Sequence, residues 1–339
     1  MPATQSKITV INNPDSGLPG ENHRELLQHL GSPTWITVKG RDSTRRRAIV
    51  TLLHGNEPSG LIAVHRLLSG DLEPATDLGI MIAAVDAALS EPMLSHRYIP
   101  TEKDLNRCFS PPYSTSQEQL AGNIIDIISD YEPEALIDTH NTSAHSRPFC
   151  VAVREDSRTQ AIAGLFSDTL VVIDQQMGTL LHHLPAGLPA ATVEFGGFMD
   201  PNADLLATET LRRFISIDQL PDSPGTPIRT LRHPLRLETE HHLDVAYSSS
   251  IDESRDLTII NTIDQLNFHS VSAGTPLGWF TAHEHRNLVA RNISGKDTYG
   301  EYFTHTDGLL QTRVPMTIFM ATTDPVVANN DCLLYFTPH

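Results

Sequence analysis

Residues 48–58 read AIVTLLHGNEP, and this stretch decides the fold. A β-branched apolar run ends here in a histidine and, three residues later, in a carboxylate. The run predicts a buried strand, and the apolar spacing of residues 59–68 predicts that a helix follows it. Open α/β sheets place their functional sites at the carboxyl ends of strands. We therefore expect His54 and Glu57 to stand at such an edge.

Apolar runs and amphipathic segments alternate along the first two-thirds of the chain, which predicts an α/β fold. We expect strands at residues 8–11, 36–39, 48–53, 79–85, 135–138, 149–153 and 190–195, and helices at 21–30, 59–68, 117–128 and 204–215. Several of these strands are apolar throughout. Such strands are typical of a sheet that helices cover on both faces.

Three prolines and a glycine between residues 221 and 227 indicate a linker. Beyond it, short strands are expected at 258–263, 276–280, 287–293 and 314–320, without helices between them. We therefore predict an α/β domain at residues 1–221 and a smaller β-rich domain at 222–339. The cluster His283-Glu284-His285 lacks an accompanying motif, so we interpret it as a solvated loop.

Charge and composition narrow the class of protein. The 339 residues include 41 acidic and 24 basic side chains, for a net charge of -17. This charge argues against nucleic acid and anionic membranes as partners. No apolar run approaches the about 20 residues of a membrane span, and residues 1–7 lack the pattern of a signal peptide. With only three cysteines, we expect a cytoplasmic protein. Homo-oligomerisation is left open.

Two histidines and a carboxylate suggest a metal site. A catalytic zinc ion usually has three protein ligands and one open position. His54 and Glu57 would supply two, and His140, at the end of the apolar strand of residues 135–138, would supply the third. A single histidine after a strand is more often structural, but the pairing with the first motif favours a ligand. Asp138 is placed to orient an imidazole.

Two further motifs each allow two interpretations. Asn106 and Arg107 can together grip a carboxylate, because the guanidinium forms two parallel hydrogen bonds and the amide adds another. The same residues also suit a helix cap or a surface turn. Glu194 ends an apolar strand and precedes two glycines. It is either a general base for a metal-bound water or a strand-end carboxylate that faces solvent.

The ordered set of motifs resembles the succinylglutamate desuccinylase/aspartoacylase family, a branch related to zinc carboxypeptidases. The motifs are residues 54–57 (HGNE), 97–98 (RY) with 104–107 (DLNR), 138–142 (DTHNT) and 193–197 (VEFGG). The resemblance covers about residues 48–200. It implies a zinc-carboxypeptidase-like mixed sheet flanked by helices, followed by a β-rich domain that walls the active site.

The resemblance also implies roles. His54, Glu57 and His140 would hold one zinc ion, and Asn106 and Arg107 would bind the substrate carboxylate. Glu194 would take a proton from the water and pass it to the leaving amine.

Two features depart from the family pattern. Aspartoacylases carry an arginine on the strand that follows the first metal motif, and Ala87 stands at that position here. Either another cation polarises the carbonyl, for which Arg97 is a candidate, or the zinc alone must do so. The segment before Glu194 lacks the arginine that contacts an acidic substrate in aspartoacylases and has His182 and His183 instead.

We therefore predict a zinc-dependent hydrolase that cleaves the amide bond of an N-acyl amino acid or a related small molecule. One alternative is a metallocarboxypeptidase that acts on short peptides. Another is a zinc-containing binding protein with little catalysis, although a pure binding protein needs no general base at position 194.

Overall fold

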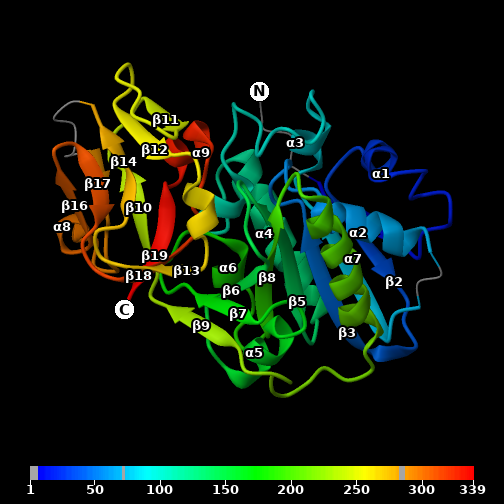
Figure 1. Cartoon of the computed structure of the whole chain (residues 1–339). Coiled ribbons are helices and arrows are strands. Elements are labelled where there is room, and N and C mark those ends of the chain that lie inside the picture. The colour runs from blue at the N-terminus through cyan, green and yellow to red at the C-terminus, as the bar shows by residue number, and fades with distance from the viewer. Residues whose placement is uncertain (1–6, 71–72, 282–286) are drawn as a thin grey trace. The chain divides into compact units, whose positions relative to one another are not determined.

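A nine-stranded mixed sheet forms the centre of the first of two units in the computed structural model (Figure 1). This unit comprises Met1–Asn141, Pro148–Val171 and Gln175–Thr230. The structure describes residues 7–70, 73–281 and 287–339, so residues 1–6 and the His283-Glu284-His285 cluster lie outside the described part.

The order of the strands brings the carboxyl ends of two important strands, β3 and β5, to one edge. In space the strands are β1 (Thr9–Asn12), β2 (Thr34–Val38), β4 (Thr76–Ile82), β3 (Asp42–Thr51), β5 (Leu136–Thr142), β8 (Ala190–Gly197), β6 (Phe149–Ala152), β7 (Thr169–Val172) and β9 (Arg229–Arg232). β3 runs parallel to both β4 and β5, with Thr51 beside Thr139. The segments that leave β3 and β5 therefore start next to each other.

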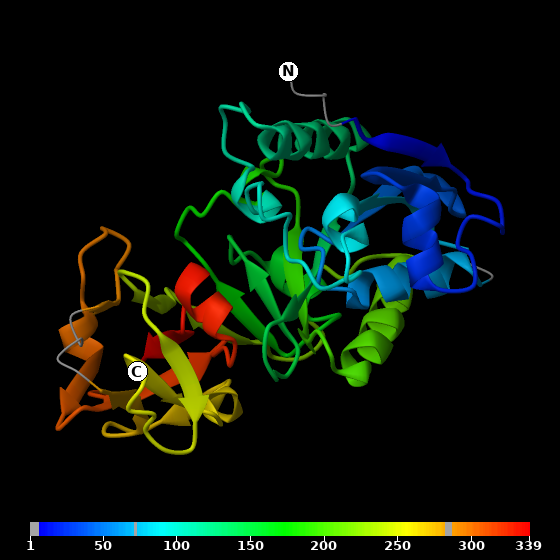
Figure 2. The ribbon, with the colours of Figure 1, turned by 90° about the horizontal axis from the view of Figure 1, so that it is seen from above.

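Helices cover both faces of this sheet, as predicted. They are α1 (His23–Leu30), α2 (Ser59–Leu68), α3 (Val85–Leu89), η1 (Leu105–Arg107), α4 (Ser116–Tyr131), α5 (Ser157–Ala163), α6 (Leu180–His183) and α7 (Pro201–Ser216). Figure 2 shows α4 on one side of the sheet and α2 and α7 on the other. Leu120 and Ile124 of α4 share a core cluster with Val50 of β3.

Two close contacts fix α2 and α7 to the sheet. A Cβ atom at Gly60 would lie 2.0 Å from Thr139 Oγ1, so the N-terminal turn of α2 approaches the strands as only glycine allows. The buried guanidinium of Arg47 donates to the carbonyls of Phe214 and Ile217, each at 2.7 Å. These carbonyls lie at the end of α7, where a cation is favourable.

The structure corrects several predicted elements. The strand predicted at 79–85 ends at Ile82, and Val85 begins α3. Its run of alanine and valine suits a buried helix as well as a strand, and periodicity does not separate the two. Ala87 therefore lies on a helix and not on a strand. β7 and α5 were not predicted, because elements this short carry little periodic signal.

The second unit, Thr142–Arg147, Val172–Asp174 and Leu231–His339, is built mainly of strands. One sheet has the order β13 (His269–Val271), β18 (Met316–Phe319), β19 (Leu334–Pro338), β10 (Leu235–Thr239) and β15 (Leu288–Val289). The other has the order β11 (Val245–Ser248), β12 (Leu257–Ile260), β14 (Pro276–Phe280), β17 (Leu309–Thr312) and β16 (Phe303–Thr306). Side chains from both sheets fill one core, among them Leu237, Leu257 and Leu310.

Short helices interrupt these strands, so the prediction of an uninterrupted series is wrong. They are η2 (Ile263–Leu266), α8 (Tyr299–Tyr302) and α9 (Pro325–Asn330). The signal for α9 was present, because Asp324 caps the helix and Pro325 occupies its first turn.

The predicted fold class, a mixed sheet flanked by helices and followed by a β-rich region, is confirmed. The domain boundary near residue 222 and the walling role of the β-rich part stay predictions. Among the described helices, none combines the length and apolar character that crossing a bilayer requires.

Candidate metal centre

His54 and Glu57 lie on the segment that joins β3 to α2. His54 Nδ1 is 2.8 Å from Glu57 Oε1, and both side chains are buried. The segment begins with strained backbone, since Leu52 has φ +61°. It then passes close to α3: a Cβ atom at Gly55 would lie 2.7 Å from the backbone nitrogen of Ala88. Glycine at this position lets the histidine turn in toward the sheet edge.

His140 meets this pair from the end of β5. Its Nδ1 atom is 2.7 Å from Glu57 Oε2 and 3.2 Å from His54 Nδ1. The possible ligand atoms of His54, Glu57 and His140 all lie within 4.8 Å of one another. Across residues 7–70, 73–281 and 287–339, no other group of three His, Cys, Asp or Glu side chains is close enough to share an ion.

The donor set fits a metal ion in both type and orientation. Two imidazole nitrogens and one carboxylate are ordinary zinc ligands. The second nitrogen of each imidazole faces an outer carboxylate: His140 Nε2 is 3.0 Å from Asp138 Oδ2, and His54 Nε2 is 3.3 Å from Asp104 Oδ1. Such outer carboxylates fix the ring so that the inner nitrogen points at the ion.

Electrostatics in the cluster also favour a cation. Burial opposes ionisation of Glu57, but His54 and His140 outweigh it and hold the pKa of that carboxyl well below its usual value. Burial disfavours the charged form of His140, but Asp138 and Glu57 raise its pKa well above the usual value. The same balance acts on Asp104, whose pKa is held far below normal by His54 and Arg97 despite burial. The site stabilises positive charge between carboxylates.

Glu194 is a buried carboxyl on β8, the strand next to β5. Its Oε2 atom has no hydrogen-bond partner among the described residues. Burial raises its pKa to about 7, against the opposing influence of His140 and His54. A carboxyl that titrates near neutrality can accept and return a proton at physiological pH.

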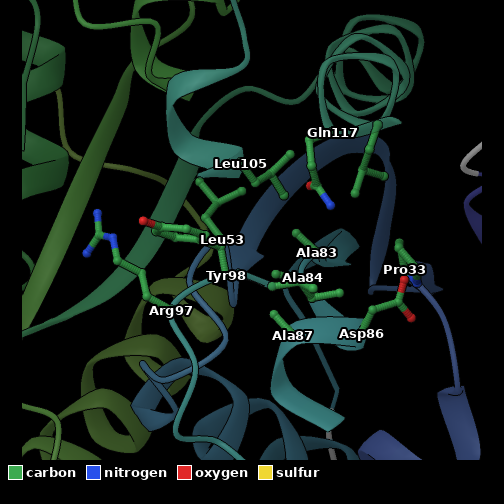
Figure 3. Close-up of a pocket in the computed structure, with 12 residues that line it drawn as sticks. Pro33, Leu53, Ala83, Ala84, Asp86, Ala87, Arg97, Tyr98, Leu105 and Gln117 are labelled. Carbon is green, nitrogen blue, oxygen red and sulfur yellow. The ribbon is translucent and has the colours of Figure 1, made fainter. Parts of the chain in front are cut away.

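Arg97 approaches the cluster from the long segment between α3 and η1. Its Nε donates to Asp104 Oδ2 at 3.0 Å, and Nη1 is 3.4 Å from Glu57 Oε1. Arg97 and Ala87 line the same pocket, together with Leu53 (Figure 3). In that view the guanidinium of Arg97 points away from Ala87. The structure thus brings Arg97, and not a side chain at position 87, to Glu57 of the cluster.

Asn106 and Arg107 lie on η1, which Asp104 caps. The Asn106 side-chain oxygen accepts a hydrogen bond from the backbone of Leu180 at 3.1 Å, and Arg107 Nη1 donates to the Asn106 carbonyl at 3.0 Å. η1 is thereby tied to α6. His183 on α6 contacts Ser110 Oγ at 3.2 Å, which strengthens the same link.

Asp104 is the site residue that the sequence analysis did not assign. It opens the motif DLNR, which was considered only for its asparagine and arginine. The signal was a capping aspartate beside an arginine, a pattern too common to reveal a contact with a histidine 50 positions earlier.

The family model described as Succinylglutamate desuccinylase/Aspartoacylase catalytic domain matches residues 43–214, just over half of the chain. The chain belongs to this family. The matched segment contains His54, Glu57, His140 and Glu194. The two activities in the family's name are hydrolyses of amide bonds. A search of curated proteins finds no match.

Solved structures share the fold at low sequence identity. A succinylglutamate desuccinylase/aspartoacylase from Rhodobacter sphaeroides is 16% identical with a TM-score of 0.59, over 89% of this chain and 87% of that one. Succinylglutamate desuccinylase from Vibrio cholerae is 15% identical with a TM-score of 0.54, over 87% of this chain and 99% of that one. The ectoine utilization protein EutE (DoeB) from Ruegeria pomeroyi is 19% identical with a TM-score of 0.50, over 82% of this chain and 87% of that one. At these identities the likeness establishes the fold alone.

Proposed function

We propose that this protein is a zinc-dependent hydrolase that cleaves the amide bond of an N-acyl amino acid or a related small molecule. Family membership supports amide hydrolysis, and the buried cluster of His54, Glu57 and His140 supports a metal-dependent route. One ion per chain is expected. The acyl group and the amine are left to experiment.

One observation carries the proposal: the buried Glu194 Oε2, which has no hydrogen-bond partner in the described part of the chain, lies on the strand beside the one that bears His140. Leaving such an atom unpaired costs free energy, and a structural role would not require it. The proximity of His140 and Glu57 to this carboxyl, both of which act on its pKa, supports a shared site. A pure binding site has no need for a proton acceptor there.

Each residue has a distinct task in the proposed reaction. When bound, zinc supplies a Lewis acid and lowers the pKa of water to about 7. Glu194 accepts the proton of the attacking water and then delivers it to the leaving amine. Arg107 and Asn106 hold the substrate carboxylate and so orient the amide. Arg97 provides positive charge to the oxygen of the tetrahedral intermediate.

The test is a hydrolysis assay with N-acetyl and N-succinyl amino acids and with dipeptides. We expect hydrolysis of an acyl amino acid that chelation abolishes and zinc restores. Glu194→Gln should keep the metal but lose at least about 100-fold in kcat, the usual contribution of a general base. Glu209→Gln, on the exposed side of α7, is the matched control.

The other outcomes are equally informative. Full activity of Glu194→Gln would remove this residue from the mechanism. A preference for dipeptides would favour the peptidase alternative. Bound metal without hydrolysis of any substrate would favour a binding protein.

A further inference from the structure

A threonine on β8 contacts the carboxylate that orients His140. Thr192 Oγ1 donates to Asp138 Oδ2 at 2.9 Å, and the same oxygen is 3.0 Å from His140 Nε2. β5 and β8 are neighbours in the sheet. Side chains two positions apart on a strand share a face, so Asp138 and His140 stand beside Thr192 and Glu194.

The hydrogen bonds of the Asp138 carboxylate show why the Thr192 hydroxyl matters. Asp138 is 1% exposed, and its Oδ1 atom has no hydrogen-bond partner among the described residues. Both hydrogen bonds therefore reach Oδ2, one from the imidazole and one from the threonine hydroxyl. Without the hydroxyl, the imidazole alone would hold a buried carboxylate that can rotate about its terminal torsion.

We propose that Thr192 is a positioning residue for the metal centre. It fixes Asp138 so that His140 keeps its proton on Nε2 and presents Nδ1 to the ion. This inference rests on the proposed metal site and adds to it a residue that acts on His140 through Asp138. It also gives β8 two tasks, because the strand that carries Glu194 also sets the orientation of a metal ligand.

The competing interpretation is that Thr192 serves only as a β-branched residue that suits a strand. Thr192→Val separates the two, because valine keeps the shape and the strand preference and removes only the hydroxyl. Thr192→Ser keeps the hydroxyl and loses the methyl group. Thr51→Val is the matched control: Thr51 is buried on β3, and its hydroxyl has no partner among the described residues.

The experiment measures zinc affinity by competition with a chromogenic chelator, after each variant has been shown to fold. Thr192→Val should bind zinc about 10-fold to 100-fold more weakly, the usual effect of removing an outer partner. Thr192→Ser should stay within a few-fold of the wild type, and Thr51→Val should equal it. Thr192→Ala removes the same hydroxyl and must show the same loss if valine disturbs folding.

A second readout is the ¹⁵N spectrum of His140 in the zinc-loaded protein. We expect a single Nε2–H tautomer in the wild type and a broadened or mixed signal in Thr192→Val. Unchanged zinc affinity in Thr192→Val, or an equal loss in Thr51→Val, would overturn the positioning role. In both cases, wild-type zinc binding and hydrolysis would leave the proposed function intact, whereas a wild type that binds no zinc would overturn both.

Discussion

Replacement of Glu194 by glutamine should stabilise the metal-free protein at neutral and alkaline pH. The wild-type carboxyl is buried, and burial raises its pKa from the ordinary value of 4.5 to about 7. A buried charge without a partner is costly, so the folded protein keeps this carboxyl protonated at a pH at which the unfolded chain ionises it. Glutamine has nearly the same shape and carries no charge at any pH.

The sign follows from proton binding. Between pH 4.5 and about 7 the folded protein holds a proton at Glu194 that the unfolded chain has lost. The contribution of Glu194 to the free energy of unfolding therefore falls as the pH rises through this range and then levels off. The pKa difference corresponds to a loss of about 3 kcal/mol in the free energy of unfolding of the wild type. Glu194→Gln should therefore be more stable than the wild type by this amount above pH 7, and equally stable near pH 4.

The assay is urea unfolding of chelator-treated wild type and Glu194→Gln at several pH values from 4 to 8. Because the rest of the cluster is the same in both proteins, the difference between the two curves reports the replacement of Glu194. Glu209→Gln controls for the general effect of removing one negative charge. A stability difference that stays constant with pH would refute the claim that Glu194 is buried without a compensating partner.

Three substitutions test other contacts. Arg47→Leu should destabilise the protein by about 3 kcal/mol or more in chemical denaturation, because the buried guanidinium pairs with Glu134 at 2.8 Å. Gly60→Ala should destabilise it by roughly 1–3 kcal/mol, despite the helix preference of alanine, since the new Cβ would press on Thr139; thermal unfolding measures this. Asp104→Asn should weaken zinc binding about 10-fold in a chelator competition; unchanged affinity would remove Asp104 from the site.

The sequence predicted the two strands that carry the cluster, because in each an apolar run stops at a polar residue. Parallel pairing of β3 and β5 then brings His54 near His140, although 86 positions separate them. An apolar run followed by a histidine is a local signal that marks each strand end. The rule that the carboxyl ends of parallel strands share an edge then predicts that the two histidines lie close together.

The remaining site residues come from a segment with little regular structure. Arg97 and Asp104 lie between α3 and η1, where no periodic pattern restricts the path of the chain. Their contacts with Glu57 and His54 depend on tertiary packing of that segment. The position of Ala87 on a helix was missed for a different reason: a run of alanine and valine suits a helix as well as a strand.

Anomalous diffraction at the zinc edge, from crystals grown with zinc, tests the central claim most directly. We predict one peak per chain, within about 2.0–2.2 Å of His54 Nδ1, His140 Nδ1 and a Glu57 oxygen. A peak at other residues, or no peak at saturating zinc, would contradict the account.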